Sequence, residues 1–410
     1  MKTEYGPHAR QFRTYALVST LCLFLSALAG AFLWLAPRMR LLPSYIFFFS
    51  FAASSVMLFQ TVLTRSRERL PELDLHEPMR TMIAAVSVTL LSVISELAAV
   101  GWLKIPAGII LGVTVLYHGY SIWQGFTPRE IWEHVALRFF ITDMFFLLVA
   151  AVGLSALGWK ETWPETWFIP DFLRPSTVFL GASFPLTLTF TGFLYLYAQE
   201  NNGLSPLEER IFDWWYYILV GGVLTFLAVI LLDLRSVMQS MALILATCVF
   251  IVTALFAGRL ARNLRSIGLL YAFVGSTGLL AASTAGNCLI ASRTPTFPAG
   301  ENPLLLSHVH MAQLGWVCIS FWGILYVLWP MMLRLDAGKV SWLPPVDDTP
   351  SSARSWVTLQ LVLAIGGLTA LVASHLLDHR PLMVLSGVAF AAATLIPLPV
   401  LRLLGRTTST

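Results

Sequence analysis

Charged side chains are scarce in this chain of 410 residues. Asp, Glu, Lys and Arg together make up 12% of the sequence, whereas hydrophobic residues make up 57%. A soluble globular protein carries charge on about a quarter of its residues. The mean hydropathy of +0.74 agrees with this deficit. The composition therefore excludes a soluble globule and predicts an integral membrane protein in contact with the lipid bilayer.

Cysteine is also scarce, and its four positions form no motif. Cys22, Cys248, Cys288 and Cys318 include no CxxC pair, and the CxxCH attachment of a c-type cytochrome is absent. The sequence also lacks a nucleotide-binding glycine loop, a repeat of fixed period and a long soluble segment. We therefore expect one integral membrane domain over residues 1–410, which receives any electrons from another protein.

Long apolar runs are what the sequence has in abundance. Each is long enough to cross roughly 30 Å of hydrocarbon as a helix. The sequence therefore predicts an all-α, polytopic membrane bundle of about 12 transmembrane helices. The runs cover residues 15–36, 45–63, 80–100, 105–124, 137–158, 176–198, 212–232, 237–257, 267–290, 304–330, 355–376 and 382–401.

The basic residues predict the orientation of these spans, because cytoplasmic loops retain Lys and Arg. With both termini inside (N-in and C-in), the cytoplasmic connectors hold most of the 26 Lys and Arg residues. Neither of the two densest clusters has interleaved aromatic residues, so we expect no nucleic acid partner. The clusters are Arg65, Arg67, Arg69 and Arg80, and then Arg259, Arg262 and Arg265.

Two histidines, His308 and His310, open the tenth apolar run and are candidate cofactor and metal ligands inside the hydrocarbon region. Residues two positions apart lie about 200° from each other around a helix. The pair is therefore poorly suited to one ion and better suited to two cofactors that flank the helix, which favours haem over zinc. In the predicted orientation both histidines lie near the outer face of the membrane.

A second pair of histidines ends the eleventh run, near the same outer face. His375, Asp378 and His379 stand at positions i, i+3 and i+4, so a continuous helix would place both imidazoles on one face. His375 and His379 are therefore candidate metal ligands, and His375 is also a candidate second ligand of a haem. The alternative is an interfacial helix end, formed with Arg380 and Pro381.

Three further polar residues within the spans have simpler interpretations. An ionisable group in a span usually faces the bundle interior or reaches water. Glu96 and Asp143 stand near the ends of their runs, so we expect both to reach the membrane surface. We expect His118, toward the inner end of its run, to be a histidine satisfied by helix packing.

One stretch of the tenth run carries a specific resemblance. The residues concerned are His308–His310, Leu314–Val317, Gly323, Tyr326 and Pro330. This stretch resembles the tenth helix of haem-copper oxidase catalytic subunits, particularly of the cbb type. It is also similar to NnrS-type membrane proteins of the nitric oxide response. Elsewhere the resemblance is architectural, in the number of spans, the inside termini and the histidines near the outer face.

The resemblance implies haem b as cofactor. In the oxidases the first histidine of the pair ligates the high-spin haem and the second ligates the low-spin haem, so these roles would fall to His308 and His310. The oxidases also have a haem ligand in the second span and three copper-binding histidines in the sixth and seventh. Here those three spans contain no histidine, so we do not expect oxygen reduction by the family mechanism.

Three functions remain open. The first is a haem-associated protein of the cytoplasmic (inner) membrane, in electron transfer or in respiration linked to nitric oxide or oxygen. Its partners would be other respiratory-complex subunits and a diatomic gas. A second ligand from His375 would favour electron transfer, whereas a five-coordinate iron would bind the gas. The other two are a structural or accessory subunit of a respiratory membrane complex and a cofactor-free transporter with twelve helices.

Overall fold

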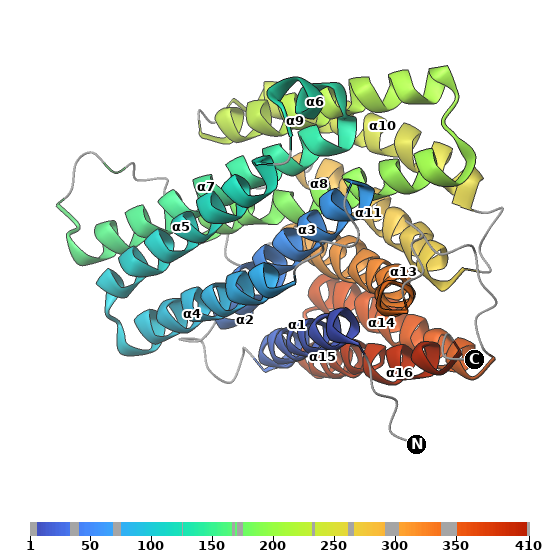
Figure 1. Cartoon of the computed structure of the whole chain (residues 1–410). Coiled ribbons are helices and arrows are strands. Elements are labelled where there is room, and N and C mark those ends of the chain that lie inside the picture. Colours follow the sequence, from blue (N-terminus) through green and yellow to red (C-terminus); the bar gives the residue numbers. More distant parts are fainter. Residues whose placement is uncertain are drawn as a thin grey trace. The chain divides into compact units, whose positions relative to one another are not determined.

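Every regular element that the computed structural model describes is a helix, and the described ranges contain no strand (Figure 1). The described residues are 6–32, 41–68, 75–124, 126–165, 169, 175–231, 234–260, 266–291, 303–337 and 351–407. The predicted all-α membrane bundle is therefore confirmed. Much of the two arginine clusters used for the orientation lies outside the described residues.

The helices follow the apolar runs closely. Two of them, η3 and η7, are π-helices, and η5 is a short 3₁₀-helix. In chain order the elements are α1 (Pro7–Ala31), α2 (Leu42–Tyr45), η3 (Ile46–Ala53), α3 (Ser54–Glu68), α4 (His76–Ala98), η5 (Gly101–Leu103), α5 (Lys104–Trp123), α6 (Pro128–Glu133), α7 (Val135–Thr162), α8 (Pro175–Asn202), α9 (Pro206–Leu231), α10 (Arg235–Leu260), α11 (Ile267–Ala291), α12 (Pro303–His310), η7 (Met311–Cys318), α13 (Ile319–Asp336), α14 (Ser351–Leu377), α15 (Arg380–Leu395) and α16 (Pro397–Thr407).

Nine continuous helical stretches in the described part of the chain are long and apolar enough to cross a membrane. Each of the twelve runs predicted from the sequence overlaps a helix. Helices α8, α9 and α10 coincide with predicted runs but are not among the nine. The chain is a multi-pass membrane protein, while the count of twelve and the N-in, C-in orientation stay predictions.

Large apolar side chains cover the outer surface of several spans. On α4 and α5, the exposed fractions are 63% for Ile83, 57% for Ile109 and 61% for Val113. A soluble protein rarely exposes apolar patches of this extent, because they drive association in water. In a bilayer the same faces contact lipid chains at no such cost. The exposed apolar faces therefore fit contact with the lipid bilayer.

The chain divides into two compact units. The first unit comprises Met1–Leu196 and Met331–Trp342, and the second comprises Tyr197–Pro330 and Leu343–Thr410. Both units contain segments that are far apart in the sequence. The single membrane domain expected from the sequence stays a prediction.

In the first unit, a buried lysine joins helices α4, α5 and α7. Lys104 is 1% exposed, and its Nζ lies 2.6 Å from the carboxylate oxygens of both Glu96 and Glu161. Tyr45 donates its hydroxyl to Glu96 over 2.9 Å. A charge within a span is costly unless an opposite charge compensates it. The charge of Glu96 is therefore compensated by Lys104, a partner that its position in the sequence does not predict.

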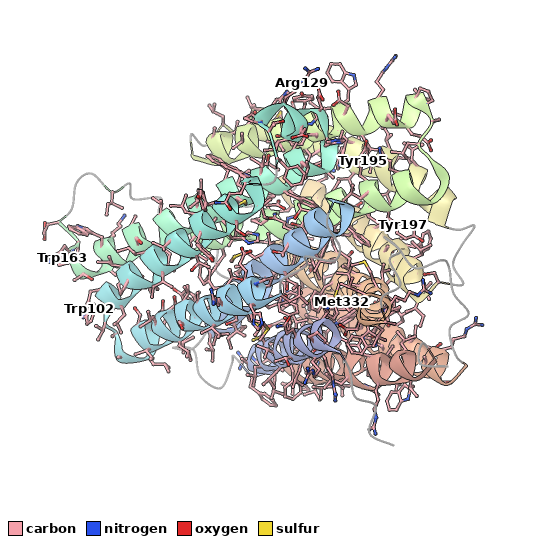
Figure 2. All side chains as sticks on the ribbon, in the orientation of Figure 1. Trp102, Arg129, Trp163, Tyr195, Tyr197 and Met332 are labelled. Carbon is pink, nitrogen blue, oxygen red and sulfur yellow. The ribbon has the colours of Figure 1, made fainter. Side chains whose placement is uncertain are left out.

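Aromatic side chains gather beside this cluster, where α5 begins and α7 ends. Trp102 and Trp163 lie together at one end of the first unit, and Arg129 lies at its other end (Figure 2). The Trp159 and Trp163 rings are 4.6 Å apart between centroids. Tryptophan is enriched at membrane–water interfaces, where its ring contacts hydrocarbon and its N–H contacts water. The tryptophans therefore suit this end of the unit to a position at a membrane–water interface.

In the second unit, glycines bring α11 into close contact with the helix that follows the histidine pair. A Cβ at Gly278 would lie 2.5 Å from the backbone carbonyl of Gly315 in η7. A Cβ at Gly275 would lie 2.3 Å from the Ser320 hydroxyl, and one at Gly268 would meet Val327 at 2.3 Å. Small residues allow such close approach of membrane helices. This row of glycines fixes α11 against η7 and α13.

Candidate functional site

His308 lies in the last turn of α12, with its ring against the backbone of α11. Its Nδ1 atom lies 2.7 Å from the carbonyl oxygen of Ala282. A carbonyl only accepts hydrogen bonds, so Nδ1 carries the proton and donates it. In the neutral ring the lone pair is then on Nε2. This arrangement, with one imidazole N–H held by a carbonyl, is the one that orients metal-binding histidines in proteins.

The position of His308 depends on the glycines of α11. A Cβ at Gly286 would lie 3.0 Å from His308 Nδ1 and 3.1 Å from Cε1. Only glycine leaves the imidazole enough room to reach the Ala282 carbonyl without displacing the ring. The glycine row that packs α11 against η7 and α13 therefore continues to the histidine.

His310 turns toward α14, where it meets His375. His310 Nδ1 and His375 Nε2 are 3.2 Å apart, the ring centroids are 5.0 Å apart and the ring planes differ by 11°. One of the two nitrogen atoms must therefore donate and the other accept. If His310 donates, its Nε2 keeps the lone pair. If His375 donates, the lone pair is on His375 Nδ1.

The divergence of His308 and His310 agrees with their spacing in the sequence. One ring contacts α11 and the other contacts α14. Immediately after His310 the backbone changes to the π-helix η7. Isolated π-helical turns occur frequently at functional sites. Nothing in the residue pattern predicts this change of backbone geometry.

His379 does not share a helix face with His375, so that part of the sequence-based prediction is wrong. Helix α14 ends at Leu377, and Asp378 has a positive φ of 48°. His379 is exposed and caps α15, where its Nδ1 accepts the backbone N–H of Leu382 over 3.2 Å. The break in the helix turns the His379 side chain toward the start of the next helix. His379 is a cap, as the alternative interpretation expects, but it caps the following helix, because Arg380 and Pro381 begin α15.

The geometry limits how a haem iron fits these histidines. Metal–imidazole bonds are about 2 Å long, so two imidazoles on one iron place their ligating nitrogens about 4 Å apart. The 3.2 Å between His310 Nδ1 and His375 Nε2 is too short for iron between these two atoms. The Nε2 atom of His308 carries the lone pair that a metal bond needs, and so does Nε2 of His310 where His310 donates to His375.

No group of three or more His, Cys, Asp or Glu residues in the described ranges is arranged to hold a metal ion. The metal-binding roles predicted for His308, His310, His375 and His379 stay predictions. His310 and His375 are the two of these four that the structure brings into direct contact.

Two polar residues of the first unit also differ from expectation. Asp143 is fully buried, with no exposed surface, so the prediction that it reaches the membrane surface is wrong. His118 is 1% exposed and its Nδ1 lies 3.0 Å from the Glu77 carboxylate. Its Nε2 has no hydrogen-bond partner, so helix packing satisfies only one of its two nitrogens.

In comparisons with protein-family models and with curated proteins, the chain matches none. The resemblance carried by His308–Pro330 therefore stays a prediction.

Proposed function

We propose that the chain is a haem-binding protein of the cytoplasmic membrane, with twelve spans and both termini inside. Haem b is the cofactor, His308 Nε2 is one iron ligand, and His310 Nε2 ligates a second haem on the opposite side of α12. The protein acts in electron transfer or in respiration linked to nitric oxide or oxygen. Other subunits of a respiratory complex supply its electrons.

The hydrogen bond from His308 Nδ1 to the Ala282 carbonyl carries this proposal. At 2.7 Å it fixes the tautomer that leaves Nε2 able to bind iron. The residue lies within the apolar stretch Pro303–Asp336, where an unneeded imidazole is an uncommon choice of side chain.

His375 has a different role in this proposal from the one its sequence position suggested. It accepts the Nδ1–H of His310 on its own Nε2, over the observed 3.2 Å. His310 Nε2 then keeps its lone pair, in the same way as His308. His375 is therefore a positioning residue that acts through His310, and it does not bind iron itself.

The residues of the chain also limit the chemistry. When bound, haem b supplies an iron that transfers one electron or coordinates a diatomic gas. The predicted sixth and seventh spans contain no histidine, so the copper ligands needed to reduce oxygen are missing from the sequence of those spans. The proposal is therefore for electron transfer or gas binding without oxygen reduction.

Optical spectroscopy of single variants tests the assignment. We expect His308→Ala and His310→Ala each to remove or shift part of the reduced haem absorption of the purified protein. His375→Ala should shift the His310-dependent bands and leave the haem content near that of the wild type, whereas His375→Gln, which keeps a side-chain acceptor, should shift them less.

The exposed His379 provides the matched control, since His379→Ala removes an imidazole from the same end of the helices without changing an iron ligand. Unchanged spectra in both His308→Ala and His310→Ala would contradict the proposal. Protein that binds no haem would instead favour the structural subunit or the transporter.

A further inference from the structure

Asp143 has an environment that the proposed haem function does not use. It stands on α7 without exposed surface, and it contacts α3 and α8 of the same unit. Its Oδ2 accepts the amide N–H of Gln60 over 3.0 Å and the hydroxyl hydrogen of Thr189. Gln60 also donates to the carbonyl of Phe140 over 3.1 Å. Gln60 and Thr189 are likewise fully buried.

Two oxygens in this cluster are left without a donor. Asp143 Oδ1 and Gln60 Oε1 are buried and have no hydrogen-bond partner. Each belongs to a group whose other polar atom takes part in the 3.0 Å bond between Gln60 Nε2 and Asp143 Oδ2. A carboxylic acid and a primary amide pair through two parallel hydrogen bonds, N–H to C=O and O–H to C=O. One added proton on Oδ1 would supply the donor that such a pair needs.

We propose that Asp143, Gln60 and Thr189 form a proton-binding site inside the first unit, loaded at neutral pH. The proton resides on Asp143 Oδ1 and is donated to Gln60 Oε1. Gln60 Nε2 and the Thr189 hydroxyl donate to Oδ2, which acts as the carbonyl oxygen of the acid. Both oxygens that lack a donor are then satisfied, and the site carries no net charge.

The surrounding charges favour a proton over an ionised carboxylate. No ion pair joins Asp143 to a basic residue in the described part of the chain. On α7 itself, Arg138 stands five positions earlier and therefore about 140° away around the helix. On α5, His118 is engaged with Glu77 of α4. An isolated buried carboxylate is costly, and such groups take up a proton instead.

Among the described side chains of α3 and α8, none adds a compensating cation. On α3 the described side chains from Ser54 to Thr64 include no titratable group. On the part of α8 that belongs to this unit, Tyr195 is the titratable residue with a described side chain. A hard metal cation would need six or more oxygen ligands, and this cluster offers two unsatisfied oxygens. The proton is therefore the ligand that the cluster fits.

Infrared spectroscopy of the full chain in lipid tests the site directly. In the wild-type minus Asp143→Asn difference at neutral pH, we expect the carbonyl stretch of a protonated carboxylic acid, equally strong with and without sodium chloride. Gln60→Met should move this band to higher wavenumber, because the acid loses its amide partner. The control Asp378→Asn removes an exposed carboxyl group and should change only carboxylate bands.

Thermal unfolding gives an independent outcome. Asparagine reproduces the neutral acid, with an amide N–H in place of the acid O–H, so Asp143→Asn should unfold within a few degrees of the wild type. Asp143→Ala should unfold earlier. A difference spectrum with carboxylate bands alone, or sodium-dependent stabilisation lost in Asp143→Asn, would overturn the proposal. Failure of Asp143→Asn to fold while Asp143→Ala folds would overturn it as well.

Discussion

The close approach of α11 and η7 leads to a quantitative prediction for Gly278. A Cβ at this position would lie 2.5 Å from the carbonyl carbon and oxygen of Gly315. Ordinary carbon contacts begin near 3.5 Å, so the two backbones must separate by about 1 Å to admit one methyl group. The added Cβ and the Gly315 carbonyl are both fixed to a helix backbone, so neither can rotate away. Gly278→Ala therefore forces a helix to move.

The expected free-energy change follows from two opposing terms. Overpacking a tight interface costs about 1–3 kcal/mol, and a clash with backbone belongs near the upper end. Alanine gains about 1 kcal/mol over glycine in a helix interior. The net destabilisation for Gly278→Ala is about 2 kcal/mol. At Gly366, where an added Cβ meets nothing within 4 Å, Gly366→Ala should stabilise by about 1 kcal/mol.

Reversible unfolding in mixed micelles, followed by circular dichroism, measures this difference of about 3 kcal/mol between the two variants. The comparison holds the chemical change constant and varies only the space around the methyl group. Equal stability of Gly278→Ala and Gly366→Ala would refute the close packing of α11 against η7. It would also remove the basis for the position of His308, which depends on the same row of glycines.

Two buried polar clusters can be tested by the same unfolding assay. Lys104→Met leaves the Glu96 and Glu161 carboxylates without their lysine partner and should cost about 2 kcal/mol. Breaking a fully buried pair costs about 3–5 kcal/mol, and the loss here is smaller because both carboxylates are partly exposed. Wild-type stability of the variant would contradict this. Gln360→Leu removes the acceptor shared by the hydroxyls of Tyr271 and Tyr326 and should cost about 3 kcal/mol, whereas Tyr326→Phe should cost about 1. Equal losses in these two variants would contradict a shared acceptor.

The features that the sequence predicts correctly are local ones. Hydropathy and run length predict the helices because a span must be apolar over about 20 consecutive residues. The divergence of His308 and His310 follows from helix geometry over three residues. Neither prediction needs knowledge of distant segments, and both agree with the structure.

The features that the sequence does not predict depend on backbone changes at single positions. The π-helix Met311–Cys318 has no distinctive composition, because it differs from an α-helix only in its hydrogen-bond register. The end of α14 at Leu377 depends on a positive φ at Asp378, which is an unusual conformation for a residue other than glycine. The residue pattern therefore predicts a continuous helix, which places His379 wrongly on the same face as His375.

Buried polar pairs were missed for a different reason. Asp143 is satisfied in part by Gln60, which lies 83 residues away in the sequence. Position within a run suggests only how close a residue is to the membrane surface. It does not reveal that two other helices supply donors to the same carboxyl group. The predicted exposure of Asp143 was wrong because tertiary packing determines its depth.

The central proposal is that His308 binds haem iron, and the haem content of the purified protein tests it most directly. We expect full-length protein from cells well supplied with haem to show a reduced-minus-oxidised haem b spectrum and stoichiometric iron. We also expect His308→Ala to lose part of both. Colourless wild-type protein without iron, purified from the same cells, would contradict the account.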